Sequence, residues 1–160
     1  MSELVATNEE DDDPLLLDRQ VCFPLYAATN LLTRLYGPVL GKIGLTYPQY
    51  LVMLVLWEHQ PQTVGALGAR LYLDSGTLTP LLKRMETAGF VTRHRDPDDE
   101  RRVLITLTVK GRDLRKQAAK VPETMLDGYK PEGIEDLQES VRTLVAILAQ
   151  HAGVRPVSGT

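Results

Sequence analysis

The feature that most constrains the fold is the stretch 63–108, in which helical spacing gives way to strand alternation. Two short helical patterns flank a turn: the first follows Thr63, and the second follows Asp74 and ends near Gly89. Thr and Asp are favoured N-cap residues because their side-chain oxygens accept hydrogen bonds from free amides of the first turn. Gly is common just after a helix. The stretch therefore predicts helix, turn and second helix, the latter over about 75–88.

The residues after Gly89 change from a helical to a two-residue period. Val91, Val103, Ile105 and Leu107 alternate with polar residues, on either side of a charged turn at 96–102. This pattern is typical of a two-stranded hairpin. Two helices followed by a charged hairpin make a winged helix-turn-helix, a unit shaped for a DNA groove. The expected fold class is mainly α with a small β wing.

The distribution of charge separates a tail from a domain. The 160-residue chain has a net charge of −3, but residues 1–18 hold seven acidic and no basic residues, while 61–115 hold ten basic and seven acidic ones. The part expected to bind DNA is thus mildly basic. We expect a disordered acidic tail at 1–14, one domain at 15–151 and a frayed tail at 152–160. Within the domain, the winged helix-turn-helix covers about 62–108.

Helical patterns also flank this module. One helix is expected from near Phe23, with a kink or interruption at Gly37-Pro38 and a resumption to about Ile43. Thr46 is the expected N-cap of the next helix, which is apolar almost all round and should be buried. After the wing, a helix from Thr108 to about Met125 should bend at Pro122.

The last helix, at about 134–150, follows a turn at 127–131 and has an apolar stripe that includes Leu137, Val141, Leu144 and Leu148. Half-site recognition by winged helices commonly needs a dimer. The segments 15–45 and 108–150 are therefore the expected dimerisation helices.

Small polar and cationic side chains gather on the predicted DNA-binding elements. Early polar residues of the second helix can reach base edges, and later cations can meet phosphates. Arg101 at the wing tip, positioned by Asp99, is the candidate for a minor groove. A solvated helix and a soluble turn are the plainer interpretations of each part alone. Pro80 should cause an irregular first turn or a later helix start. The full set of expected DNA contacts is Ser75, Thr77, Thr79, Lys83, Arg84, Arg93, Arg95, Asp99 and Arg101.

The single cysteine, Cys22, precedes the first predicted helix, so no intramolecular disulfide can form. A helix N-terminus stabilises a thiolate through its dipole and free amides. Tyr26, Tyr36 and Tyr47 follow, and phenol hydroxyls can donate to a thiolate. A lone cysteine is more often an inert core residue, and a tyrosine more often packs with a satisfied hydroxyl.

Longer strings in the chain resemble the MarR-type winged-helix repressors, and within them the organic-hydroperoxide-sensing branch called OhrR. The broad pattern is Asp99-x-Arg101 followed by Val103-x-Ile105-x-Leu107-Thr108 and Gly111. The branch patterns are Cys22-Phe23-x-Leu25-Tyr26, Thr46-Tyr47-Pro48-Gln49-Tyr50, Leu56-Trp57-Glu58-His59 and the run from Leu73 to Pro80. The resemblance covers about residues 15–150, and Pro80 is itself a feature of the branch.

The resemblance implies a homodimer that represses transcription from a pseudo-palindromic DNA operator, and the lack of a secretory signal or membrane-spanning run makes the cytoplasm the expected location. Cys22 would match the cysteine that an organic hydroperoxide oxidises, and Tyr36 and Tyr47 would match tyrosines that reach it across the dimer. Arg101 would match the wing arginine in the minor groove. Some members carry a second cysteine, whereas this chain has Asp127 in that region. It therefore resembles the one-cysteine type, in which a small-molecule thiol caps the oxidised sulfur as a mixed disulfide.

Two other functions stay open from the sequence. One is a MarR-type repressor that a small phenolic ligand releases, with Cys22 structural. The other is a one-cysteine peroxidase, which would leave the wing unexplained. His59, His94 and His151 are too scattered for a metal site, and no phosphate-binding glycine loop is present. We expect no cofactor, no catalytic residues and no membrane span.

Overall fold

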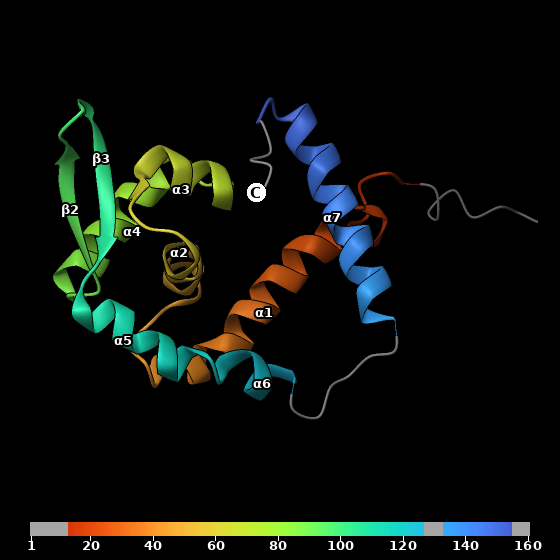
Figure 1. Cartoon of the computed structure of the whole chain (residues 1–160). Coiled ribbons are helices and arrows are strands. Elements are labelled where there is room, and N and C mark those ends of the chain that lie inside the picture. Colours follow the sequence, from red (N-terminus) through yellow and green to blue (C-terminus); the bar gives the residue numbers. More distant parts are fainter. Residues whose placement is uncertain (1–12, 127–132, 155–160) are drawn as a thin grey trace, which may run out of the picture.

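The computed structural model describes residues 13–126 and 133–154 (Figure 1). Most of the expected acidic tail, the expected turn at 127–131 and the end of the expected frayed tail lie outside these ranges. In chain order the elements are η2 (Leu17–Arg19), α1 (Phe23–Gly41), α2 (Tyr47–Glu58), β1 (Gln62–Thr63), α3 (Val64–Leu71), α4 (Ser75–Thr87), β2 (Val91–Asp96), β3 (Asp99–Leu107), α5 (Val109–Ala118), α6 (Val121–Leu126) and α7 (Ile134–His151).

The helix starts lie where the capping residues predicted them. The side chains of Thr63, Asp74 and Thr108 each accept the backbone N–H three residues further on, at 3.0, 2.8 and 3.0 Å. The backbone N–H of Thr46 donates to Oε1 of Gln49 at 2.9 Å, as in a capping box. These local bonds satisfy amides that a helix leaves free, so the predicted boundaries of α2, α3, α4 and α5 are confirmed at their N-termini.

The wing is part of a three-stranded antiparallel sheet in the order β1-β3-β2. The expected hairpin is present, with Val91 opposite Leu107 and Arg93 opposite Ile105. The third strand, β1, pairs Gln62 with Ile105 and was not predicted. It has only two residues, too few to show a two-residue period in sequence.

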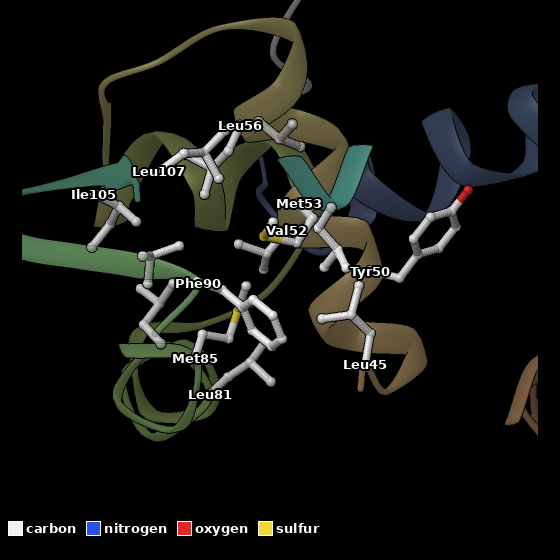
Figure 2. Close-up of a cluster of buried hydrophobic side chains, with 14 of the residues drawn as sticks. Leu45, Tyr50, Val52, Met53, Leu56, Leu81, Met85, Phe90, Ile105 and Leu107 are labelled. Atoms are coloured by element: carbon white, nitrogen blue, oxygen red, sulfur yellow. The ribbon is translucent and has the colours of Figure 1, made fainter. Parts of the chain in front are cut away.

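The core lies where α2, α4 and the sheet meet (Figure 2). The buried α4 side chains form one face of that helix, and α2 is buried on several sides, as its apolar sequence predicted. Trp57 is half-buried, and its Nε1 donates to the carbonyl of Gly111 at 2.9 Å, which ties α2 to α5. Side chains with no more than 1% exposure include Leu40, Val52, Met53, Leu56, Leu67, Leu78, Leu82, Met85, Val91 and Ile105.

Two glycines permit close backbone approaches within this module. A Cβ at Gly68 of α3 would lie 2.7 Å from the carbonyl oxygen of Leu73, in the turn that leads to α4. A Cβ at Gly111 of α5 would collide with the carbonyl of Phe90. Any larger residue would displace these backbone segments, so the turn before α4 and the chain entering β2 depend on these two positions.

Three prolines have effects that differ from those expected. α1 runs without interruption through Pro38 and ends at Gly41, before Ile43. α4 begins at Ser75 as an α-helix despite Pro80, because Asp74 caps its first turn. The helix expected from Thr108 to Met125 is two helices, α5 and α6, which separate at residues 119–120. Pro122 has no N–H for the carbonyl four residues earlier, that of Ala118, where α5 ends.

α7 and most of α1 lie outside the core, although Leu40 near the end of α1 is fully buried in it. Figure 1 shows α7 crossing α1, on the side away from the wing. Ala149 is the only buried residue among the described side chains of α7. Exposed apolar side chains on the two helices include Tyr26, Leu31, Leu35, Leu137, Val141 and Leu148.

Candidate functional site

The exposed face of α4 holds most of the expected DNA contacts. Ser75, Thr79 and Lys83 are exposed and recur every four residues, so they share one side of the helix. Arg84 is also exposed. The hydroxyl of Thr77 instead donates to Oδ2 of Asp74 at 2.9 Å, so its proton is used in the helix cap. α4 therefore presents two hydroxyls and two cations outward, which suits it as a recognition helix.

The expected DNA contact Arg93 is held by a neighbouring carboxylate. Its Nε donates to Oε2 of Glu86 at 3.0 Å, and its backbone N–H donates to Oε1 at 3.2 Å. Arg95 is exposed, and its Nη1 donates to the carbonyl of Glu100 at 2.6 Å across the hairpin. The two arginines are thus part of the wing framework as well as sources of positive charge.

The wing tip presents Arg101 to solvent. Oδ1 of Asp99 accepts the backbone N–H of Arg101 at 3.1 Å, so Asp99 fixes the backbone that carries the arginine. Among the described residues, no hydrogen bond joins Asp99 to the guanidinium itself. An exposed arginine at a hairpin tip is consistent with the expected minor-groove contact, which stays a prediction.

Asp96 is a residue of the wing that the sequence did not single out. It is 6% exposed; its Oδ1 accepts the N–H of Asp98 at 3.0 Å, and its Oδ2 lies 3.4 Å from Nε of Arg102. A buried carboxylate needs such partners. The position of Asp96 at the start of a charged turn gave the only signal in the sequence, and three other acids follow it in the same turn.

Cys22 lies at the N-cap position of α1 and is exposed. Its carbonyl accepts the backbone N–H of Tyr26 at 3.2 Å, which places its thiol at the positive end of the helix dipole. Tyr26 lies one turn further along and is 68% exposed. The side chains of Cys22 and Tyr26 therefore share an accessible face at the start of α1.

The other two expected tyrosines form a pair at the opposite end of α1. The rings of Tyr36 and Tyr47 have centroids 4.8 Å apart, and that of Tyr50 lies 6.2 Å from Tyr36. Burial, with a smaller effect from nearby Tyr36, raises the pKa of the Tyr47 hydroxyl above its usual value. A tyrosine hydroxyl, with an ordinary pKa of about 10, is protonated near neutral pH, so Tyr47 can donate a hydrogen bond.

Cys22 and the tyrosine pair are far apart within one chain. Tyr36 lies fourteen positions after Cys22, which corresponds to about 20 Å at the rise of an α-helix. One protomer therefore does not bring the expected thiol site together. Tyr36 instead lines an open groove of about 900 Å³ between α1 and α7, together with Leu32, Tyr72, Leu137, Val141 and Val145.

Within residues 13–126 and 133–154, no cluster of His, Cys, Asp and Glu has the geometry of a metal site. None of the helices in the same ranges is long and apolar enough to cross a bilayer.

Comparison with known sequences supports the features above. The model of the MarR family matches residues 45–103, which include α2, the helix-turn-helix and most of the wing. An organic hydroperoxide resistance transcriptional regulator of Bacillus subtilis is 49% identical over 140 residues, which are 88% of this chain and 95% of the relative.

Comparison with solved structures gives the same result. Reduced AbfR bound to DNA has a TM-score of 0.70 at 36% identity, over 82% of this chain and 93% of that one. A disulfide form of AbfR, a protein of Staphylococcus epidermidis, has a TM-score of 0.57 at 40% identity, over 81% and 92%. Given this extent of similarity, the chain belongs to the MarR family of winged-helix transcriptional regulators, a family of DNA-binding proteins rather than enzymes.

Proposed function

We propose that the protein is a homodimeric transcriptional repressor that releases its operator when an organic hydroperoxide oxidises Cys22. It acts on a pseudo-palindromic DNA site in the cytoplasm. The similarity to a hydroperoxide resistance regulator supports the oxidant class. The exposed face of α4 and the Arg101 wing tip support the DNA-binding role. The domain is expected to span 15–151.

The observation that carries the proposal is the separation of Cys22, at the start of α1, from Tyr36 further along α1 and from Tyr47 at the start of α2. Tyr36 lies about 20 Å along α1 from Cys22 of its own chain, and the ring of Tyr47 packs against that of Tyr36. A second copy, packed against the exposed apolar faces of α1 and α7, can bring its tyrosines to this thiol. Burying those faces also removes apolar side chains from water, which favours association.

The chemistry uses few groups. The Cys22 thiolate attacks the distal peroxide oxygen of ROOH, the O–O bond breaks, and a proton completes the alcohol ROH. Cys22 becomes a sulfenic acid. A small-molecule thiol R′SH then attacks the sulfenic sulfur, forming the mixed disulfide Cys–S–S–R′ and water. Tyr26 of the same helix and the protonated Tyr47 of the partner donate to the thiolate and hold it for attack.

The switch acts through packing between the protomers. A thiol adduct is larger than a thiol, and it occupies a face that a partner covers in the dimer. Moving Tyr36 and Tyr47 displaces α1 and α2, and α2 packs directly against α3 and α4. The two recognition helices then lose the spacing that an operator requires, so DNA affinity falls.

The test is operator binding by wild type and by Cys22→Ser, each with and without cumene hydroperoxide plus free cysteine. A duplex selected from a random library by the reduced wild-type protein serves as the operator. Reduced wild type and Cys22→Ser are expected to bind equally. Treatment is expected to release only the wild type, and mass spectrometry should find one cysteine adduct per protomer.

If Cys22→Ser is released by the same treatment, the thiol mechanism is wrong, and release by a small bound ligand becomes the better explanation. If the reduced protein has no preference for the selected duplex, the repressor function itself is wrong.

A further inference from the structure

Resting on the DNA-binding function proposed above, we infer that Glu86 and Arg93 are positioning residues for DNA recognition. They fix the angle between the recognition helix α4 and the wing, so that the helix and Arg101 reach the same DNA together. In this role Arg93 acts through Glu86 and the backbone of β2, in place of the direct DNA contact that its charge predicted.

The backbone already fixes the end of α4. Gly89 has a φ of +78°, its N–H donates to the carbonyl of Glu86 at 2.9 Å, and the N–H of Phe90 donates to the carbonyl of Met85 at 3.0 Å. This pair of bonds is the Schellman arrangement. It determines where the chain leaves the helix, while the direction of β2 beyond Phe90 still depends on further contacts.

The carboxylate of Glu86 supplies one of those contacts. β2 is an edge strand of the sheet, bonded to β3 on one side. The N–H of Arg93 donates to Glu86 Oε1, so this amide of the edge strand is satisfied by the recognition helix. Oε2 accepts Nε of the same residue at 3.0 Å. Both carboxylate oxygens therefore bind one residue, which restricts rotation as well as distance.

Three other cationic side chains of α4 and the wing differ from that of Arg93 in their contacts. The side chains of Lys83, Arg84 and Arg101 are exposed and have no hydrogen bond or ion pair with other described residues. The side chain of Arg93 is 29% exposed and is engaged at Nε. Lys83, Arg84 and Arg101 can therefore contact phosphates or a groove. Arg93 instead bonds to Glu86 and links β2 to α4.

The role of the Glu86–Arg93 contact between α4 and β2 follows from the geometry of DNA binding. A winged helix places a helix in the major groove and a hairpin tip in the minor groove, and the two must fit one DNA surface at once. A protein that holds both in that arrangement before binding loses less conformational freedom on binding. Breaking the Glu86–Arg93 contact should weaken sequence-specific binding, while binding driven by phosphate charge should persist.

The test compares Glu86→Gln, Arg93→Lys and the double variant with wild type. Lys83→Gln serves as a matched control on the exposed face of the same helix. Affinity is measured over a salt series for a duplex selected from a random library by wild-type protein, and for an unrelated duplex of equal length. Melting temperatures give the folded fraction of each variant.

A positioning pair should lose operator affinity by about 5- to 30-fold in either single variant, with little further loss in the double variant. The ratio of selected to unrelated affinity should fall by the same factor. The log–log salt slope of Arg93→Lys and Glu86→Gln should equal that of wild type. Lys83→Gln should instead reduce the slope by about 0.9 for each phosphate that the variant no longer neutralises.

Three results would overturn the inference. Additive losses would mean that the two residues act separately. Glu86→Gln binding like wild type would mean that the carboxylate positions nothing. Losses matched by the decrease in folded fraction, with an unchanged affinity ratio, would mean that the pair only stabilises the fold. If wild type itself cannot distinguish the two duplexes, the proposed function fails instead.

Discussion

The winged module, from α2 to β3, and the outer helices α1 and α7 differ in how much of their apolar surface one chain buries. In the module, α2, α4 and the sheet bury one another, and its buried side chains have partners within the chain (Figure 2). In the outer helices, apolar side chains such as Leu35 and Leu137 are 66% and 60% exposed. The module therefore has its core within one chain, with Leu40 of α1 included, whereas the exposed apolar side chains of α1 and α7 are left for a second surface. The proposed sensor, Cys22, lies at the start of α1, on the surface left for a second protomer, so a change there can alter how the protomers pack.

The largest expected effect is on the core of the winged module. Leu82→Ala removes a side chain with 0% exposure and should lower the free energy of unfolding by about 2–5 kcal/mol. Leu35→Ala is the matched control, because its side chain is exposed within the protomer. Its effect should depend on protein concentration, whereas that of Leu82→Ala should not. Denaturant titrations at several protein concentrations measure both, and equal losses at all concentrations would remove the contrast.

A second expectation concerns the apolar stripe of α7. Replacing both Leu137 and Val141 by Asp should weaken dimerisation by roughly two orders of magnitude, because each charge would lose its water in the interface. Thr143→Asp, on another face of α7, should have little effect. Sedimentation velocity gives the dissociation constants. A wild-type protein that is monomeric at micromolar concentration would contradict the proposed role of α1 and α7 in dimerisation.

On the module, Arg101→Ala should weaken operator binding by about tenfold and leave the melting temperature unchanged. The guanidinium is exposed at the wing tip, so its loss leaves no buried group without a partner. Arg115→Ala, on α5, is a control of equal charge change. Fluorescence anisotropy with labelled duplex measures the loss. If Arg101→Ala melts at a lower temperature by as much as it loses affinity, the arginine is structural.

The smallest effect concerns the start of α4. Hydrogen bonds from the backbone and side chain of Thr77 lower the pKa of the Asp74 carboxyl below its usual value of 3.8. A lowered pKa means that the ionised carboxylate stabilises the fold above pH 3.8 and that this contribution disappears as pH falls through the lowered value. Asp74→Asn keeps an oxygen acceptor but does not titrate.

The difference in melting temperature between wild type and Asp74→Asn should therefore shrink on acidification through that range. A difference that is constant from neutral to acid pH would show that the charge of Asp74 contributes nothing to the cap.

Local chemistry explains why the sequence predicted the module well. Thr63, Asp74 and Gly89 each act within a few residues of their own position, so their effect can be inferred from neighbours alone. The break before Pro122 was placed too late because the missing N–H affects the carbonyl four residues earlier. β1 was missed because its two residues take their structure from pairing with distant β3.

The candidate site was predicted unevenly for a similar reason. Exposure of Ser75, Lys83 and Arg101 follows from helical and strand periods. The engagement of Arg93 by Glu86, and the burial of Asp96, depend on how elements pack, which charge alone does not reveal. The separation of Cys22 from Tyr36 follows from the helical pattern after Phe23, which already placed them fourteen positions apart on one helix.

The most direct measurement of the central claim uses mixed dimers. One protomer carries Cys22→Ser with both tyrosines intact; the other keeps Cys22 but carries Tyr36→Phe and Tyr47→Phe. Different affinity tags allow purification of the mixed dimer. If the site forms across the dimer, its single cysteine faces two intact tyrosines, and cumene hydroperoxide should consume the thiol at the wild-type rate. A rate equal to that of the homodimer lacking both tyrosine hydroxyls would contradict a site shared between protomers.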